Sequence, residues 1–532
     1  MIRDEIKKAA SDAVKKIMPG IAVPDFSVEV PENPEHGDYA TNVALLLAKT
    51  AKKPPMEIAQ LLVPQLLVDP FERVSAAPPG FLNFWLTGEA LQKEMREILK
   101  KRKAYGAGIK KEEKIQIEFI SANPTGELTM GNGRGAFLGA ALAGVLDLAG
   151  FRVTREYYVN DAKASTQIKE LGKTGLGEGE MYLTTGLKKI IRKLERQIAA
   201  LKNKQPKNLQ GEAGWLIAQE IQQKNKKFIE KKLKIMFDVW LSENSLYERG
   251  ETDATLKRLN EKNLVYEKDG ALWLKTTAGG DDEDHVIVRS SGEPTYFYSD
   301  LAAHMNKLER GFGKIIYIWG ADHHGHVKRT KAALKLLDVP EGVFEFIIMQ
   351  VVRLIRGGEE VKMSKRKGEF VTLEELVDEV GLDAARFFFL MHSPDSHMDF
   401  DLELAKERSA KNPVYYVQYA HARVASIFKK AEGLKPDSKK TDLLVAEEEK
   451  GLIKKLIRFP EVVEDTSRDY QVIRLTRYAT ELARAFHDFY EKHRVITDDK
   501  ELTSARLALV KAVQIVLQNI LGLLGISAPL KM

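Results

Sequence analysis

The first hundred residues alternate between helical and strand-like spacing of apolar positions. Strand-like runs, FSVEV (residues 26–30) and GFLNFWL (residues 80–86), flank a polar turn, PENPEHGDYA, and a helical stretch at residues 41–49. A charged helix is expected over residues 88–103, and AYGAGIKKEEK is typical of a linker. The pattern therefore predicts an N-terminal α+β domain over residues 1–108. It opens with a helix whose apolar positions are Ile2, Ile6, Ala9, Ala10, Val14 and Ile17.

From residue 109 the pattern changes to compact apolar strands joined by helices. IQIEFI is followed by a Pro/Gly loop, an Ala/Gly/Leu-rich helix, AFLGAALAGVLDLAG, and a second strand, FRVTREYYV. This β–loop–α–β order indicates a parallel α/β sheet with ligand loops at the strand ends. The character returns with IIYIWG (residues 315–320) and FEFIIMQVVRLI (residues 344–355). We therefore expect an α/β domain, Rossmann-like in its strand–helix order, over residues 109–398.

Residues 174–284 differ from their surroundings and are predicted to be an insertion in the α/β domain. They contain an amphipathic helix heavy in Lys and Arg, whose basic face is interpreted as a solvated surface, although an RNA site is the alternative. The apolar positions of this helix are Leu187, Ile190, Ile191, Leu194, Ile198 and Leu201.

Residues 399–532 are predicted to be helical to the end, as a bundle of their own. Residues 507–524 form a long apolar helix that ends at Gly525. A second helix carries an apolar stripe of Val472, Leu475, Ala479, Leu482, Ala483, Phe486 and Tyr490.

Composition narrows the function classes without choosing one. The 82 basic and 76 acidic residues give a net charge of +6, which permits a polyanionic partner on one face but does not require it. The chain has no cysteine, which excludes disulfides, Cys-ligated zinc and thiol catalysis. Charged residues interrupt every apolar run at the N-terminus, so we expect no signal peptide. We also expect no apolar stretch of 18 residues, no membrane association and a cytoplasmic protein.

The loop after the first α/β strand has the composition of an anion-binding segment. In Ser121-Ala-Asn-Pro-Thr-Gly-Glu-Leu-Thr-Met-Gly-Asn-Gly-Arg134, glycines lie between a strand and a helix. Glycine lets backbone N–H groups approach a ligand, and a helix N-terminus favours an anion. Packing explains many such loops, so the signal is weak by itself, and it does not match the GxxxxGKS pattern of Walker-type ATPases.

A second glycine-bounded segment, GGEEVKMSKRKG (residues 357–368), carries four cations. It could close on a phosphate chain and stabilise charge that develops there. An ordinary Lys-rich surface turn is the alternative, and composition alone favours that turn.

Together the two segments resemble the HIGH and KMSKS signatures of class I aminoacyl-tRNA synthetases, in the expected order with a long insertion between them. Further segments are similar to those of arginyl-tRNA synthetases: EFISANPTGELTMGNGRG, EYYVND, WGADHHGHVKR and GLDAARFFFLMHSPDSHMDFD. HGDYATNVAL resembles that family's N-terminal extra domain, and NPVYYVQYAHAR with LGLLGISAPLKM resembles its helical anticodon-binding domain. The resemblance covers nearly the whole chain.

The resemblance implies roles at the ATP site, with one departure from the signature. Thr129 and Asn132 stand where HIGH has histidines; Thr can donate one O–H and the Asn amide supplies N–H donors, so both remain catalytic candidates. Gly131 and Gly133 are expected to contribute backbone groups to ATP binding. The KMSKS match implies that Lys362 and Lys365 are catalytic and that Met363, Ser364 and Lys365 bind ATP.

Arginine selection requires carboxylates opposite the guanidinium. From the residues alone, Glu118 could instead be a surface carboxylate at the end of a strand, and Asp300 could instead be a helix N-cap. Tyr296 and Asp300, four apart, would share one helical face. By resemblance the candidates are Glu118, Asn123, Tyr296, Asp300 and His323.

The resemblance further implies ATP with Mg²⁺, L-arginine and tRNA(Arg) as reactants, and we expect a monomer. His323, His324 and His326 could suggest a metal site, but with no cysteine and no nearby HExxH we expect no protein-bound metal. Tyr415, Tyr419 and the C-terminal Met532 are candidates for stacking on tRNA bases, although Tyr at helical spacing is more often core. Two alternatives stay open at this point. One is a class I synthetase for another amino acid, and the other is a synthetase-like tRNA-binding protein with impaired catalysis.

Overall fold

The N-terminal region folds as a small antiparallel sheet covered by helices. The computed structural model describes residues 1–361 and 371–532. The strands β1 (Val28–Glu29), β2 (Tyr39–Thr41), β3 (Phe71–Ala77) and β4 (Phe81–Leu86) pair in the order β1-β2-β4-β3. The helices α1 (Ile2–Ile17), α2 (Val43–Ala51) and α3 (Pro55–Leu66) accompany them. The predicted α+β character of this region is confirmed, although the run at residues 26–30 yields a strand of only two residues.

The centre of the molecule is a five-stranded parallel sheet in the order β12-β11-β5-β6-β7. Its strands are β5 (Lys114–Glu118), β6 (Arg152–Val159), β7 (Val239–Ser242), β11 (Lys314–Gly320) and β12 (Phe344–Met349). The glycine-rich helix α5 (Met130–Leu148) links β5 to β6 and is buried along most of its length. Chain order reverses between β5 and β11, and ligands of open α/β sheets bind at such a switch point.

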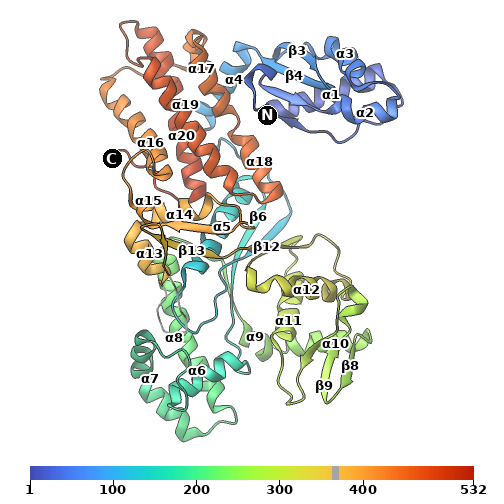
Figure 1. The fold of residues 1–532 in the computed structure, drawn as a ribbon, viewed down its shortest axis with the longest axis vertical. Coiled ribbons are helices and arrows are strands. Elements are labelled where there is room, and N and C mark those ends of the chain that lie inside the picture. The colour runs from blue at the N-terminus through green and yellow to red at the C-terminus, as the bar shows by residue number, and fades with distance from the viewer. Residues whose placement is uncertain (362–370) are drawn as a thin grey trace.

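The expected insertion at residues 174–284 is not one unit, because β7 of the parallel sheet lies inside it. The first part, before β7, is a helical layer with its own core, made of α6 (Thr166–Leu176), α7 (Thr185–Lys204) and α8 (Leu209–Lys231). The second part contains α9 (Glu243–Glu248), α10 (Glu251–Glu261) and the antiparallel strands β8 (Val265–Lys268), β9 (Ala271–Leu274) and β10 (His285–Val288). It returns to the sheet through α11 (Tyr296–Glu309). The two parts lie apart at the lower end of the molecule (Figure 1).

A small three-stranded sheet and short helices connect the parallel sheet to the helical region. After β12 the chain passes directly to β13 (Val352–Arg356). In the small sheet β13 lies in the middle, between β14 (Glu359–Glu360) and β15 (Met398–Asp401). The predicted apolar run at 344–355 is therefore two strands. The helices of this part are α13 (Leu373–Val380), α14 (Leu382–Leu390) and α15 (Leu402–Lys406), whereas α12 (His324–Leu336) links β11 to β12 of the parallel sheet.

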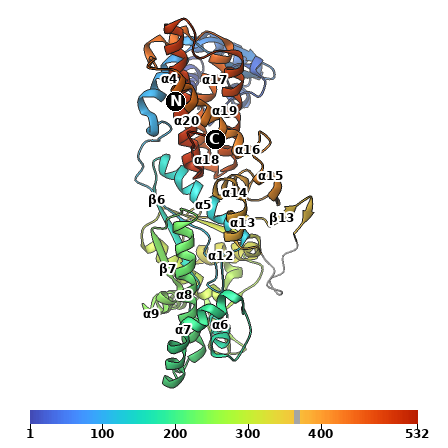
Figure 2. The same cartoon turned by 90° about the vertical axis from the view of Figure 1, so that its left-hand side faces the viewer.

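The C-terminal region is a helix bundle at the end of the molecule opposite α7 (Figures 1 and 2). It comprises α16 (Pro413–Lys430), α17 (Glu447–Ile457), α18 (Phe459–Asp469), α19 (Ile473–Lys492) and α20 (Lys500–Leu524), and α4 (Gly88–Lys101) packs against α17 and α20. The expectation of no long apolar stretch is wrong for α20, which is long and apolar enough to cross a membrane. In its most apolar window 72% is buried inside the protein, as in a core helix.

Candidate functional site

The N-terminus of α5 presents the two residues that replace the HIGH histidines. Thr129 is the N-cap of α5, and its backbone N–H donates to Oδ1 of Asn132 over 2.9 Å. The Thr129 hydroxyl donates to the same oxygen over 3.0 Å. A backbone N–H can only donate, so the atom that faces it must be the amide oxygen of Asn132. The Asn132 NH₂ group therefore points away from the cap, beside the positive end of the helix dipole.

The glycines of this loop have different roles. Gly131 is exposed, and a Cβ there would meet only the Thr129 hydroxyl oxygen, at 3.7 Å, so a ligand can reach its backbone. Gly133 is buried, and a Cβ there would lie 2.6 Å from Cδ1 of Leu373. Its small size therefore serves the approach of α13 to α5. The Gly131 backbone remains available to a ligand, whereas Gly133 is enclosed by packing.

The described chain on the two sides of the cationic segment contacts β13 before residue 362 and the α5 loop after residue 370. Lys362, Met363, Ser364 and Lys365 lie outside the described residues. After the gap, Thr372 bridges Thr129, and the Leu373 N–H donates to the Leu128 carbonyl over 2.9 Å. Before the gap, the Val361 N–H donates to the Leu354 carbonyl of β13. The chain just after residue 370 therefore contacts the cap of α5 directly.

Glu118, at the carboxyl end of β5, is buried rather than a surface carboxylate. It is 5% exposed and forms an ion pair with Lys307, which is itself fully buried. Lys307 also lies 3.3 Å from Glu156 and donates to the Tyr317 hydroxyl over 3.0 Å. Burial raises the pKa of Glu118, and Lys307 opposes that rise. The charge of Glu118 is therefore already balanced within the protein.

Asp300 lies one turn inside α11, whose N-cap is Thr295, so Asp300 is not a cap. Burial raises its pKa to about 7; Glu118 adds to the rise, and Arg329 and Lys307 oppose it. Within the described residues the Asp300 carboxylate accepts no hydrogen bond. Its charge is therefore available to a cationic ligand.

A carboxylate that the sequence analysis missed, Glu243, lies beside Asp300 at the carboxyl end of β7. Glu243 is 2% exposed, and its Oε1 accepts a hydrogen bond from the Ser299 hydroxyl over 2.6 Å. Its Oε2 is buried without a hydrogen-bond partner among the described residues. Burial raises its pKa to about 7, the hydrogen bond from Ser299 opposes that rise, and Asp300 and Asp161 add to it. A buried carboxylate oxygen with no donor is costly unless a ligand supplies one.

Glu243 and Tyr296 line the same pocket. The cavity has a volume of about 10 Å³, room for about one water molecule, so a larger ligand requires the surrounding side chains to move apart. The other lining residues are Ala162, Ser165, Thr166, Tyr247, Arg289, Pro294 and Thr295. One carboxylate, Glu243, and one tyrosine, Tyr296, thus line this cavity, and the charge of Asp300 acts on Glu243 from nearby.

The remaining arginine candidates lie in the segments that follow β5 and β11 and do not line this cavity. Asn123 is exposed in the loop after β5. His323 ends the short turn after β11, is 46% exposed at its side chain, and has its ring centroid 5.5 Å from that of Trp319. Its neighbour His326 receives a hydrogen bond from Arg329 over 2.6 Å, and burial with Arg329 lowers the His326 pKa to about 4. Among residues 1–361 and 371–532 no three metal-ligating side chains cluster.

The tRNA candidates lie on the helical region. Tyr415 and Tyr419 stack on one face of α16 with ring centroids 6.3 Å apart, and Tyr419 is 37% exposed. Arg423 donates to the Tyr419 hydroxyl over 2.6 Å and lies over its ring. Met532 is 47% exposed at the C-terminus. The pair of tyrosines with an arginine is a surface that an unpaired base could stack on.

Comparison with known proteins finds the same family in the N-terminal, catalytic and C-terminal regions of the chain. Residues 2–86 match the arginyl tRNA synthetase N terminal domain, residues 179–426 the class I (R) tRNA synthetase catalytic domain, and residues 417–532 the DALR anticodon binding domain. The arginine–tRNA ligase of Desulforamulus reducens is 44% identical over 96% of this chain and 94% of its own length. That of Geobacter sp. strain M21 is 46% identical over 96% and 95%. The solved arginyl-tRNA synthetase of Thermus thermophilus shares the fold, with a TM-score of 0.79 at 23% identity over both full chains.

Proposed function

Because this chain belongs to the arginyl-tRNA synthetase family and is an arginine–tRNA ligase, we propose how its residues divide the reaction. The family membership confirms the predicted class and the three-part fold, and it removes both alternatives considered from the sequence. ATP and arginine react first, and tRNA(Arg) accepts the arginyl group. The residue roles below are the proposal.

ATP is proposed to bind at the N-terminus of α5. Asn132 donates its amide N–H groups to the phosphate or ribose, together with the backbone at Gly131 and Gly133, of which Gly131 is the more accessible. Thr129 holds the Asn132 amide in that orientation through both of its donors. Thr129 thus acts through Asn132, and neither residue changes charge near neutral pH.

The cationic segment is proposed to stabilise the leaving group. Lys362, Ser364 and Lys365, with the backbone at Met363, face the pyrophosphate as it departs. Support comes from Thr372 and Leu373, which pair with Thr129 and Leu128 at the cap of α5. Cations placed where charge develops act mainly in the transition state.

The guanidinium is proposed to lie between Asp300 and Glu243, with Tyr296 against it. The observation that carries this is the Oε2 atom of Glu243, which is buried without a donor beside a second carboxylate. A planar fork of N–H groups supplies the missing hydrogen bonds. Glu118, whose charge Lys307 balances, then orients the other end of the substrate, with Asn123 and His323 at the pocket mouth.

The chemistry needs no enzyme nucleophile. The arginine carboxylate oxygen attacks the α-phosphorus of ATP, the bond from the α-phosphorus to the bridging oxygen breaks, and pyrophosphate leaves. The terminal ribose hydroxyl of tRNA next attacks the carbonyl of the adenylate and releases AMP. Positioning and charge stabilisation carry both steps. Mg²⁺ is proposed to enter as the complex with ATP, held chiefly by phosphate oxygens.

The domains are proposed to be residues 1–108 for contact with tRNA, 109–398 for catalysis and 399–532 for the anticodon. Tyr415, Tyr419 and Met532 are the proposed stacking residues of the last. We also propose that the protein is a cytoplasmic monomer. The tRNA is proposed to lie along the long axis of the molecule. Support comes from the elongated shape, with the N-terminal and helical domains at one end (Figure 2).

ATP–pyrophosphate exchange with each amino acid, with and without tRNA, tests this proposal. We expect exchange with arginine alone among the standard amino acids. Exchange that follows another amino acid would refute the pocket assignment. Exchange with arginine that is unaffected by Glu243→Gln would refute the role of Glu243.

A further inference from the structure

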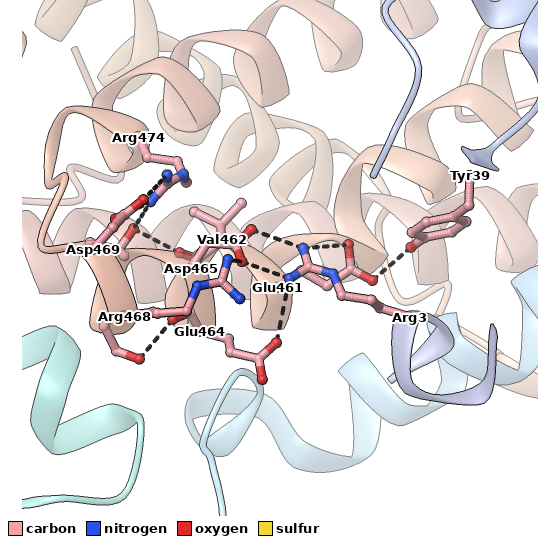
Figure 3. A network of polar contacts seen from close by, with 11 residues as sticks. Arg3, Tyr39, Glu461, Val462, Glu464, Asp465, Arg468, Asp469 and Arg474 are labelled. Carbon is pink, nitrogen blue, oxygen red and sulfur yellow. Dashed lines mark hydrogen bonds and ion pairs between the residues drawn. The ribbon is translucent and has the colours of Figure 1, made fainter. Parts of the chain in front are cut away.

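The N-terminal domain is attached to the helical bundle by a bidentate ion pair. Arg3, on α1, donates from Nη1 to Oδ1 of Asp465 over 2.6 Å and from Nη2 to Oδ2 over 2.9 Å. The Nη1 atom also lies 3.5 Å from Glu464. Arg3 is 8% exposed although it stands in the first turn of the chain. The two residues belong to α1 and α18, which are far apart in the sequence (Figure 3).

A second contact meets the first at Glu461, one turn earlier on α18. The Tyr39 hydroxyl donates to Oε1 of Glu461 over 2.9 Å, and Nη2 of Arg3 lies 3.5 Å from Oε2. Figure 3 shows Arg3 and Tyr39 reaching Glu461 from different elements of the N-terminal domain. Glu461 is 1% exposed, and burial raises its pKa while Arg3 opposes the rise. Both partners of this carboxylate therefore come from the other domain.

The HGDY motif explains how Tyr39 and its neighbour reach the bundle. Gly37 has φ +90°, and a Cβ there would lie 2.6 Å from the Phe84 carbonyl oxygen, so glycine is required. The turn aims Asp38 at α17, where Oδ1 lies 2.7 Å from Nζ of Lys454, while Oδ2 accepts the Leu86 N–H over 2.8 Å. The motif thus places two consecutive polar side chains on the helical domain.

These contacts give orientation more than stability. Buried charges cost desolvation, and apolar side chains of the same volume would hold two domains at least as firmly. Nε of Arg3 and Oε2 of Glu461 have no hydrogen-bond partner within the described residues, so the network is not fully satisfied. Bidentate and multi-partner geometry instead fixes direction, since each N–H must meet a particular oxygen.

We propose that Arg3, Asp38 and Tyr39 form an interdomain clamp on α17 and α18 that sets the position of the N-terminal domain for tRNA. These are positioning residues: they touch no substrate. The proposal rests on the proposed tRNA contact of residues 1–108. A tRNA held at two separate places binds tightly only when both are presented at the right separation.

Steady-state charging kinetics test the clamp. Arg3→Met should raise the KM for tRNA about tenfold, because the effective concentration of the second contact falls. The KM values for arginine and ATP should stay within about twofold, since those sites lie in another domain. Asp465→Asn should reproduce the effect, and Arg3→Met with Asp465→Asn should be no worse than either alone.

Arg468→Met is the matched control. Arg468 donates to the same Asp465 over 2.8 Å but belongs to α18, and within the described residues it forms no hydrogen bond or ion pair with the N-terminal domain. The Arg468→Met substitution removes one guanidinium from the network while leaving the contacts of Arg3, Asp38 and Tyr39 in place. The tRNA KM should therefore stay near that of the unaltered protein.

Domain position can be read directly, because the chain has no cysteine and introduced thiols are unique labelling sites. Glu72→Cys on β3 and Lys430→Cys on α16 place labels on exposed positions of the two domains. Their distance distribution should broaden with Arg3→Met and not with Arg468→Met. Should Arg3→Met fail to fold, Tyr39→Phe and Asp465→Asn carry the same comparison.

Two results would overturn the proposal, and they are distinguishable. If the distance distribution broadens but the tRNA KM does not change, the clamp does not position the domain for tRNA. If tRNA gives residues 1–86 no protection from hydrogen exchange in the unaltered protein, the tRNA contact itself fails, and the clamp proposal fails with it. Protection together with a raised KM in Arg3→Met supports both.

Discussion

Asp300→Asn tests the charge of the arginine pocket without changing its size. Asp300 is partly buried, and its pKa of about 7 results from burial and from Glu118. Within the described residues its carboxylate accepts no hydrogen bond, so the asparagine loses no internal bond when the site is empty. The melting temperature of the variant should therefore equal or slightly exceed that of the unaltered protein.

The loss on arginine binding can be estimated. Removing one partner of a desolvated charge pair costs about 3–5 kcal/mol. Glu243 remains as a second carboxylate, so we take the lower figure, about 3 kcal/mol, or about 150-fold in kcat/KM for arginine.

Pyrophosphate exchange with arginine and with citrulline, its neutral isostere, measures the effect. The kcat/KM for arginine should fall about 150-fold, with KM for ATP nearly unchanged, and the preference over citrulline should fall with it. Asp253→Asn, on the exposed face of α10, is the control for loss of one carboxylate nearby. An Asp300→Asn enzyme with normal arginine KM and intact citrulline rejection would refute the reasoning, because the guanidinium would then be recognised elsewhere.

Three further predictions concern the arginine pocket and the ATP site. The KM for arginine should fall as pH rises from 6 to 8, because Glu243 and Asp300, both with pKa raised to about 7, become charged over that interval; a flat profile would contradict their role. Lys365→Ala should slow exchange by raising its activation free energy about 2.7–4 kcal/mol, while the ATP affinity measured by calorimetry changes little. A kcat within a few-fold of normal would remove this lysine from the mechanism. Thr129→His with Asn132→His should keep activity near neutral pH and add a pH dependence near 6.5, measured as exchange rate against pH. A folded but inactive double variant would show that the pocket depends on the Thr129–Asn132 pair.

The elements that the sequence predicted well are those with strong periodicity. The helix at 507–524 and the stripe from Leu475 to Tyr490 became α20 and α19, because one apolar face per helix is enough to identify them. The strand β7 was missed, since four residues carry little periodic signal and lie inside a segment that otherwise differs from the sheet. Its position in the sheet depends on pairing with β6, which spacing along the chain does not reveal.

The missed strand also hid a site residue. Glu243 directly follows β7, and recognising VWLS as a sheet strand would have marked the next carboxylate as a strand-end ligand. The partner of Glu118 could not have been predicted, because Lys307 is 189 residues away and meets it only in the folded sheet. The sequence named Glu118 as an arginine-binding candidate by resemblance alone, and its ion pair with Lys307 became visible only in the structure.

A structure of the protein with a non-hydrolysable arginyl-adenylate analogue tests the central claim most directly. The account predicts the guanidinium within hydrogen-bond distance of both Asp300 and Oε2 of Glu243, and the adenylate phosphate at Asn132 and the Gly131 backbone. A guanidinium bound at Glu118 instead, with Oε2 of Glu243 still lacking a donor, would contradict it.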